Sequence, residues 1–194
     1  TDMVVLDSRP IDEFRRMTIP TAVNVPGGEL VYRIGEFVTR PETTIVVNCA
    51  GRTRSILGAE SLRSAGVPNK VVALRNGTMG FTLAGFSCDR GKDKRAPKPS
   101  APSLAWSQSA AAVVAKRYGI GRVTSETVER WRADDTRTLY LFDVRDPPEY
   151  RAGHVSGAIS APGGQLVQAT DLYAGTLGAR IVLEPAGRNS APAI

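Results

Sequence analysis

One of the two cysteines lies where a reactive thiol could be stabilised. Cys49 directly follows an apolar run, residues 45–47, and precedes a segment of helical composition, residues 55–65. The unpaired N–H groups and partial positive charge at a helix N-terminus favour a thiolate over a neutral thiol. The position of Cys49 therefore predicts a nucleophile, because the thiolate is the reactive form of cysteine.

The residues after Cys49 have the composition of an anion-binding loop. Gly51 lets the backbone curl closely round the sulfur, and Arg52 and Arg54 add positive charge. A cysteine at the end of a strand is often an inert packing residue, but packing alone does not require these neighbours. We therefore expect a catalytic Cys49 followed by a loop that binds an anion. The loop consists of Ala50, Gly51, Arg52, Thr53, Arg54 and Ser55.

An internal repeat organises the rest of the chain, with residues of the first copy recurring 136 positions later. The repeated residues of the first copy are Asp7, Arg9, Glu13, Arg15, Ala22, Pro26, Gly27, Gly28, Leu30, Val31, Ile45, Val46, Ala50, Gly51 and Arg52. Because the register survives from one apolar run to the next, the chain is expected to hold two related domains in tandem.

Each copy alternates short apolar runs with helical or turn segments, which is typical of an α/β fold with a parallel sheet flanked by helices. In the first copy we expect strands at residues 4–6, 22–25, 45–47 and 71–74, and a helix at 55–65. Further on we expect helices at 104–118 and 125–133, the second capped by Ser125, and a strand at 139–143.

The sequence predicts a first domain at residues 1–86, which carries the Cys49 loop, and a basic linker rich in proline and serine at 87–103. Residues 104–194 are expected to form a helical lead-in and the second domain. The first copy has six residues before Asp7, and the chain ends nine residues after Pro185. Each copy is therefore expected to be incomplete, the first at its N-terminal head and the second at its C-terminal part.

The remaining ionisable residues are expected to be structural. Asp7 with Arg9, and Asp143 with Arg145, stand at the ends of strands, where such pairs more often tie loops together than perform chemistry. His154 lies in a glycine-flanked turn, and its counterpart in the cysteine-bearing copy is a threonine. A histidine base would therefore be missing from the copy that needs it.

Composition limits the classes of function. Two cysteines and one histidine provide neither a disulfide framework nor a metal site at any usual spacing, so we expect no metal, no cofactor and a reducing, cytoplasmic compartment. A resolving role for Cys88 is not indicated, because nothing in the sequence places it near Cys49. No apolar run is long enough to span a membrane.

The net charge of +6 raises the question of nucleic-acid binding. Several of the cations lie together in the linker among prolines and serines, without interleaved aromatic residues or a recognised binding motif. We therefore expect a solvated linker and no nucleic-acid partner. The cations are Arg90, Lys92, Lys94, Arg95 and Lys98.

Six segments of the chain together resemble the rhodanese-homology domains. In the first copy these are residues 4–9, 18–26, 49–55 and 71–77, and in the second copy residues 141–145 and 153–159 match the same pattern more closely. The resemblance implies a thiosulfate sulfurtransferase in which Cys49 takes a sulfane sulfur as a persulfide and passes it to a thiol or cyanide. The loop from Ala50 to Ser55 would then supply amides, and Arg52 and Arg54 would hold the anionic donor.

The resemblance leaves two other functions open. Rhodanese-like domains also serve as non-enzymatic scaffolds or regulatory units. Related phosphatases share the fold, but they have an arginine six residues after the cysteine, where this chain has Ser55 and its arginine is one position earlier. The partners implied are a small-molecule sulfur donor and a thiol acceptor, and other rhodanese domains of a longer chain or a second copy of this chain remain open as further partners.

The repeat register predicts that the second copy cannot carry sulfur. Pro185 stands at the position of Cys49, and proline has neither a thiol nor an amide hydrogen. Glu184 stands at the position of Asn48 and would repel an anionic donor. We therefore expect the second copy to be a packing or docking partner for an active domain.

Overall fold

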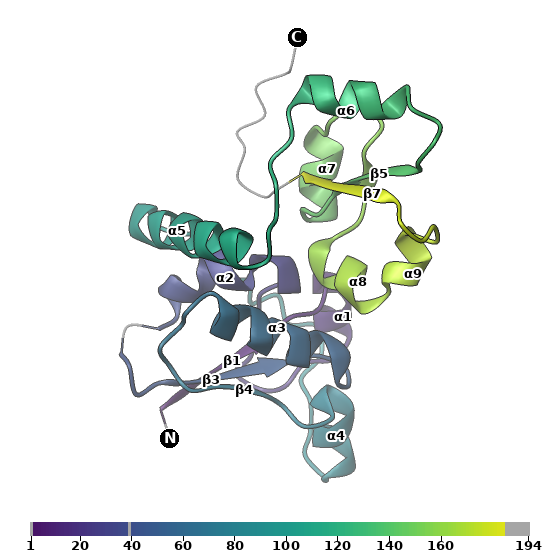
Figure 1. Ribbon diagram of the computed structural model, residues 1–194. Helices are drawn as coiled ribbons and strands as arrows, with labels where there is room; N and C mark the ends of the chain where they lie inside the picture. The colour runs from purple at the N-terminus through teal and green to yellow at the C-terminus, as the bar shows by residue number, and fades with distance from the viewer. Residues whose placement is uncertain (1, 39, 185–194) are drawn as a thin grey trace. The chain divides into compact units, whose positions relative to one another are not determined.

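The computed structural model describes residues 2–38 and 40–184 and divides the chain into two compact units, Thr1–Ile120 and Gly121–Ile194 (Figure 1). Among the described residues, no helix combines the length and the apolar character needed to cross a membrane.

The first unit is built on a four-stranded parallel sheet in the order β2-β1-β3-β4. The strands are β1 (Met3–Asp7), β2 (Val23–Asn24), β3 (Thr44–Asn48) and β4 (Val71–Ala73). The expected parallel α/β sheet is confirmed, with each predicted strand present within two residues of its expected bounds. The cysteine-bearing strand β3 lies inside the sheet, between β1 and β4.

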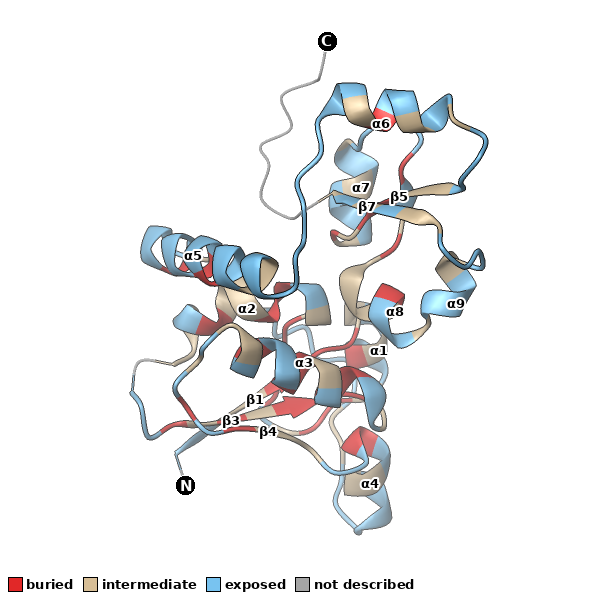
Figure 2. Ribbon diagram, viewed as in Figure 1, coloured by how far each residue is buried: buried red, intermediate tan, exposed pale blue. Residues whose placement is uncertain are grey.

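Successive residues of a strand point to opposite faces of the sheet, so apolar strand side chains lie on both faces. Helices cover both of these faces. In β1, Val4 and Leu6 pack in one core together with Leu62, whereas Val5 packs in a second core with Phe14. Figure 2 shows the buried residues concentrated along the strands and the inner helix faces. The helices are α1 (Ile11–Arg16), α2 (Leu30–Arg33), α3 (Thr53–Ser64), α4 (Gly77–Leu83) and α5 (Ala101–Arg117), with 3-10 turns η1 (Gly27–Glu29) and η2 (Ile34–Glu36).

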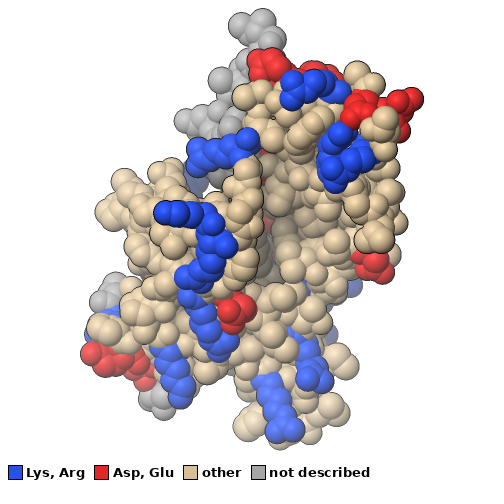
Figure 3. Space-filling model, in the orientation of Figure 1, with Lys and Arg blue, Asp and Glu red and all other residues tan. Residues whose placement is uncertain are grey.

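The segment expected to be a solvated linker, residues 87–103, is exposed at most of its positions and lies along the first unit. Its Asp89 and Arg95 make isolated bridges to Thr18 and Asn24, and Ala96 packs against the core. Helix α5 follows and packs against α2, so the two units divide at residues 120 and 121, later in the chain than expected. Figure 3 shows basic side chains scattered over the visible face with acidic ones among them.

Polar contacts explain why this segment stays on the first unit. Asp93 lies between Arg15 of α1, at 2.6 Å, and Arg95 of the segment, at 2.9 Å, so part of the basic charge is matched locally. At the start of α5, the backbone N–H of Ser100 and the hydroxyl of Ser103 donate to Glu36 at 2.8 and 2.5 Å. These bonds also lower the pKa of Glu36, the largest cause being the Ser103 hydroxyl.

The second unit has a three-stranded parallel sheet in the order β6-β5-β7. The strands are β5 (Leu139–Asp143), β6 (Ile159–Ser160) and β7 (Arg180–Glu184), and the helices are α6 (Ser125–Arg132), α7 (Pro147–Ala152), α8 (Gly163–Gln168) and α9 (Thr170–Tyr173). The N-cap of α6 is Thr124 rather than the expected Ser125, since the Thr124 side chain accepts from the N–H of Thr127.

Strand register confirms the repeat residue by residue. Leu6 pairs with Val23 in the first sheet, and Phe142 pairs with Ile159 in the second, each residue 136 positions later than its counterpart. Likewise the pairing of β1 with β3 recurs between β5 and β7. The two copies therefore share the same three-strand framework at the same register.

Candidate active site

Cys49 lies immediately after β3, and helix α3 begins four residues later. Its side chain is buried, with an exposed fraction of 2%. The carboxyl ends of parallel strands open toward the same edge of a sheet, and this edge is where α/β proteins bind ligands. The expected strand–loop–helix arrangement around Cys49 is therefore present.

Ser55 brings a hydroxyl to the sulfur. The Cys49 thiol donates to Ser55 Oγ at 3.4 Å, and Ser55 Oγ donates to the carbonyl oxygen of Arg52 at 2.9 Å. A hydroxyl can rotate its hydrogen, so the same group can donate to a thiolate once the thiol has lost its proton. The last residue of the expected loop thus lies against the Cys49 sulfur.

Helix α4 supports the loop through backbone hydrogen bonds, a contact that local sequence patterns do not predict. The N–H groups of Thr78 and Met79 donate to the carbonyl oxygens of Cys49 and Ala50 at 2.9 and 3.1 Å. A trans peptide points its N–H opposite to its carbonyl, so the amide hydrogens of Ala50 and Gly51 point away from α4. They are therefore available on the side of the loop where an anion can bind.

Gly77 makes this close approach possible. Its φ is +56°, and a Cβ there would lie 2.2 Å from the carbonyl oxygen of Cys49 and 2.8 Å from the nitrogen of Gly51. A side chain cannot occupy that space. The dipeptide Asn76–Gly77, a common turn sequence, was the signal that could have identified the position.

The two loop arginines have different surroundings. Arg52 is exposed at the N-cap of α3. Arg54 is buried and forms a bidentate ion pair with Glu13 of α1, at 2.6 and 2.8 Å. Burial lowers the pKa of the Arg54 guanidinium, but the hydrogen bond and charge of Glu13, and then the charges of Cys49 and Asp7, outweigh it and raise that pKa.

Asp7, at the end of β1, connects this strand to the end of β3 by hydrogen bonds next to the Cys49 loop. Its fully buried carboxylate accepts from the side chain of Arg9 at 2.8 and 2.6 Å and from Asn48 Nδ2 at 2.9 Å. Ser8 adds a hydroxyl bond to the carbonyl oxygen of Asn48 at 2.8 Å. As the sequence analysis expects, Asp7 and Arg9 act as a tie between elements, and this tie fixes the residue before Cys49.

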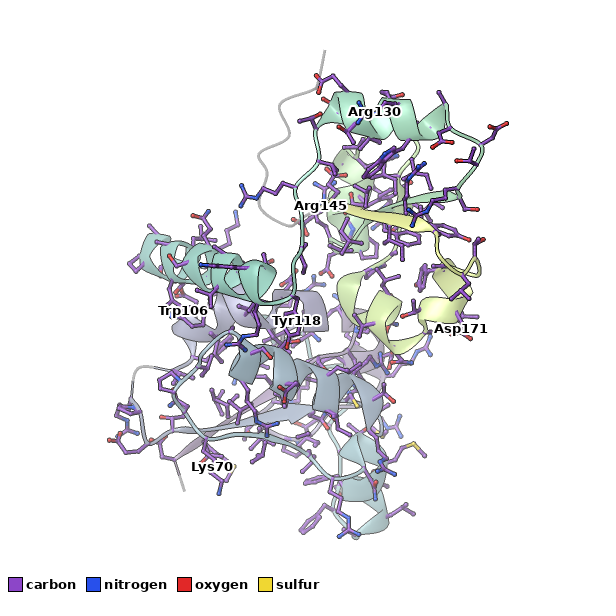
Figure 4. The ribbon with its side chains drawn as sticks, viewed as in Figure 1. Lys70, Trp106, Tyr118, Arg130, Arg145 and Asp171 are labelled. Carbon is purple, nitrogen blue, oxygen red and sulfur yellow. The ribbon has the colours of Figure 1, made fainter. Side chains whose placement is uncertain are left out.

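The second unit repeats the tie but changes its third member. Arg145 donates to both oxygens of Asp143, as Arg9 does to those of Asp7, and Figure 4 labels Arg145 beside β7. Glu184, at the position of Asn48, lies 3.7 Å from Arg145 and accepts from the N–H of Val155 at 3.3 Å. Its carboxylate is thus engaged within the second unit. Pro185, the residue at the position of Cys49, lies outside the described residues.

The other singled-out residues lie in local contacts. His154 stacks on Tyr150 with ring centroids 3.8 Å apart, and its Nδ1 is 2.9 Å from the carbonyl oxygen of Tyr150. Cys88 Sγ lies 3.6 Å from Thr82 Oγ1, just after α4. Both contacts agree with structural roles.

Comparisons with known proteins identify the family that this chain resembles. The model of the rhodanese-like domain matches residues 1–84 and 124–189. A solved thiosulfate sulfurtransferase from Pseudomonas aeruginosa is 48% identical, with a TM-score of 0.91, over 95% of this chain and 35% of that one. The chain therefore spans about a third of the length of that protein. No curated protein sequence matches the chain.

Two further solved structures are more distant. The BH2092 protein of Bacillus halodurans is 20% identical, with a TM-score of 0.40, over 46% of this chain and 65% of that one. SseA from Escherichia coli, described as a 3-mercaptopyruvate sulfotransferase, is 16% identical, with a TM-score of 0.38, over 94% of this chain and 81% of that one.

Proposed function

This chain belongs to the family of rhodanese-like domains, and on that premise we propose that it transfers sulfane sulfur through a persulfide on Cys49. One observation carries the proposal: Cys49 lies at the carboxyl end of a central parallel strand, against Ser55 and the start of α3. The 48% identity to a thiosulfate sulfurtransferase supports thiosulfate as the donor.

In the first half-reaction, Cys49 loses its proton to solvent and its thiolate attacks the outer sulfur of thiosulfate. The bond between the two donor sulfurs breaks, sulfite leaves with the bonding electron pair, and a new bond joins Cys49 to the transferred sulfur. In the second, a thiolate or cyanide attacks the terminal sulfur, and Cys49 leaves again as a thiolate. No net oxidation is required.

The protein's contribution is to hold negative charge at the loop. The first N–H groups of α3 have no acceptor within the helix, and those of Ala50 and Gly51 point away from α4, so the loop can donate to a bound anion. Ser55 can donate to the thiolate, and the exposed Arg52 can reach a donor in solvent. These groups act together at one sulfur atom.

The competing function is a scaffold in which Cys49 is only a packing residue. The 2% exposure of Cys49 favours this alternative, because a donor must reach the sulfur. A phosphatase is less well supported, since Ser55 rather than an arginine is the sixth residue after the cysteine.

We also propose a compartment that keeps thiols reduced, such as the cytoplasm, because transfer requires Cys49 as a free thiol and both cysteines are free. The second unit would then dock another rhodanese-like domain or a second copy of the chain. The proposed small-molecule partners are the sulfur donor and the thiol acceptor. These proposals concern the whole protein.

The test of the proposed function is a thiosulfate-to-cyanide transfer assay on the chain and its Cys49→Ser variant. We expect turnover in the first and none above background in the second, with unchanged circular dichroism. Cys88→Ser is the matched control and should keep full turnover. Inactivity of the unaltered chain with every donor tried would favour the scaffold.

A further inference from the structure

The same glutamate is used differently in the two copies. Glu149 of the second copy lies in the first turn of α7 and accepts from the N–H of Asp146, which caps its own helix. Glu13, its counterpart in the first copy, occupies the same position in α1, but its side chain pairs with Arg54, 41 residues away in sequence. Glu13 thus contacts the Cys49 loop, whereas Glu149 caps its own helix.

This contact changes the charge of the loop. Arg52 and Arg54 supply two positive charges, and Glu13 supplies one negative charge in direct contact with Arg54. The side chain of Arg54 is 8% exposed, whereas that of Glu13 is 33% exposed. Arg54 is thus held inward by a carboxylate that itself remains partly open to solvent.

We propose that Glu13 is a positioning residue that sets which anionic donors the Cys49 loop accepts, by pairing with Arg54 and leaving Arg52 as the cation that meets the donor. The inference rests on the proposed function and names the residue that tunes it. Glu13 and a bound donor compete for the positive field of Arg54. The loop therefore has a smaller net positive charge than its two arginines indicate. This weakens the binding of a doubly charged anion more than that of a singly charged one.

Two donors of different charge test the idea. Thiosulfate carries two negative charges, and methanethiosulfonate carries one while offering the same sulfane sulfur; sulfite leaves from the first and methanesulfinate from the second. In Glu13→Gln, the amide can still accept from Arg54, but the opposing charge is gone. We expect the KM for thiosulfate to fall roughly two- to fivefold, and that for methanethiosulfonate to fall less, with kcat changed little.

A matched control is available one residue away. Asp12→Asn removes the same charge from α1, but Asp12 is 81% exposed and 3.7 Å from Arg15. That variant should leave the ratio of the two KM values as it is. An equal fall in Glu13→Gln and Asp12→Asn would mean that only the net charge of the chain matters and would overturn the assignment.

A second measurement needs no sulfur donor. The rate of Cys49 alkylation by iodoacetamide at a fixed pH reports how readily the thiolate forms, and it should be roughly two- to fivefold higher in Glu13→Gln than in the unaltered chain. The difference should shrink in high salt. If Glu13 only supports the loop structurally, the alkylation rate will stay the same or fall, and the KM for thiosulfate will rise; either result contradicts the proposal.

The two failures can be told apart. Absence of turnover with both donors, together with the expected rise in alkylation rate, would refute the proposed sulfur transfer and keep the effect of Glu13 on the charge of the loop. Turnover without that rise and without a change in donor preference would keep the sulfur transfer and refute the role of Glu13. Glu13→Asp, which keeps the charge, covers the case in which Glu13→Gln does not fold: it should preserve the donor preference of the unaltered chain.

Discussion

Ile45 and Ile181 occupy the same position in the third strand of the two copies, yet Ile45 is fully buried and Ile181 is 51% exposed. The next inward position shows the same contrast, with Val47 at 0% and Leu183 at 51%. In the first copy, Leu62 of α3 packs on this face. The residues that would correspond to α3 in the second copy begin at residue 189, outside the described residues.

The comparison separates what builds the sheet from what builds the site. Both copies keep the register of their three common strands and the buried Asp–Arg tie at the carboxyl end of the first of these strands. They differ from the end of the third strand onward, where the first copy has Asn48, Cys49 and the loop that leads into α3. We therefore expect the proposed chemistry to depend on the short segment that follows the third strand of the first copy.

The largest expected effect comes from giving the first copy the residue of the second. Asn48→Glu places a carboxylate beside Asp7, where Asn48 Nδ2 now donates at 2.9 Å, and adds negative charge next to Cys49. We expect kcat/KM for thiosulfate to fall at least about tenfold, because this charge opposes both the thiolate and the donor. Glu184→Asn, the reverse exchange, should leave the kinetics unchanged; equal losses in the two variants would erase the distinction between the copies.

The support of the loop by α4 gives the next effect. Gly77→Ala forces a Cβ to within 2.2 Å of the Cys49 carbonyl at a positive φ, so the loop must shift. We expect a loss of about 2–4 kcal/mol in the free energy of unfolding of the first unit and a fall in kcat. The matched control is Gly85→Ala, because Gly85 also has a positive φ, +85°, but has open space around it. Urea unfolding should show a loss of only about 1 kcal/mol in the free energy of unfolding.

Matched isoleucines provide a smaller effect on stability alone. Ile45→Ala should destabilise the first unit by about 3 kcal/mol, because the side chain is fully buried. Ile181→Ala should cost about 1 kcal/mol or less, because half of that side chain is already in contact with solvent. Hydrogen exchange of β3 and β7 in the two variants measures both values, and a large loss in Ile181→Ala would show that this face of the second unit is covered in solution.

The smallest effect concerns acid stability of the second unit. Hydrogen bonds from Thr136, and then from Arg180 at 2.6 Å, lower the pKa of Asp134 to about 2. A lowered folded-state pKa stabilises the fold above the unfolded pKa, so this contribution is lost as pH falls from about 4 to about 2. In Asp134→Asn, the rate of hydrogen exchange in β7 should therefore depend slightly less on pH over this range. The pH dependence of hydrogen exchange in β3 should not change.

Local patterns of the sequence predicted the sheets but only part of the site. Apolar runs fixed the strands, and the repeat fixed the register between copies, because both depend on periodicity along the chain. The pairing of Glu13 with Arg54 could not be predicted, since it joins α1 to α3 across 41 positions and both residues have other common partners. The sequence gives no reason to distinguish Arg52 from Arg54. Only the fold shows that Arg52 is exposed and that Arg54 is buried against Glu13.

The placement of the linker segment along the first unit could not be predicted for a related reason. Its composition is typical of a solvated segment, and composition does not reveal that Asp93 matches Arg15 or that Glu36 accepts from Ser100 and Ser103. The cap of α6 was missed by one residue, because Thr124 and Ser125 are both good capping residues and only geometry selects between them.

The central claim is that sulfur resides on Cys49 and on no residue of the second copy, and locating the added sulfur tests it most directly. The chain is incubated with thiosulfate, digested without reductant and mapped by mass spectrometry. We expect one added sulfur atom on the peptide that contains Cys49, none on the peptide with Cys88 and none on residues 121–194. An added sulfur on Cys88 or within the second copy, or none on Cys49, would contradict the account.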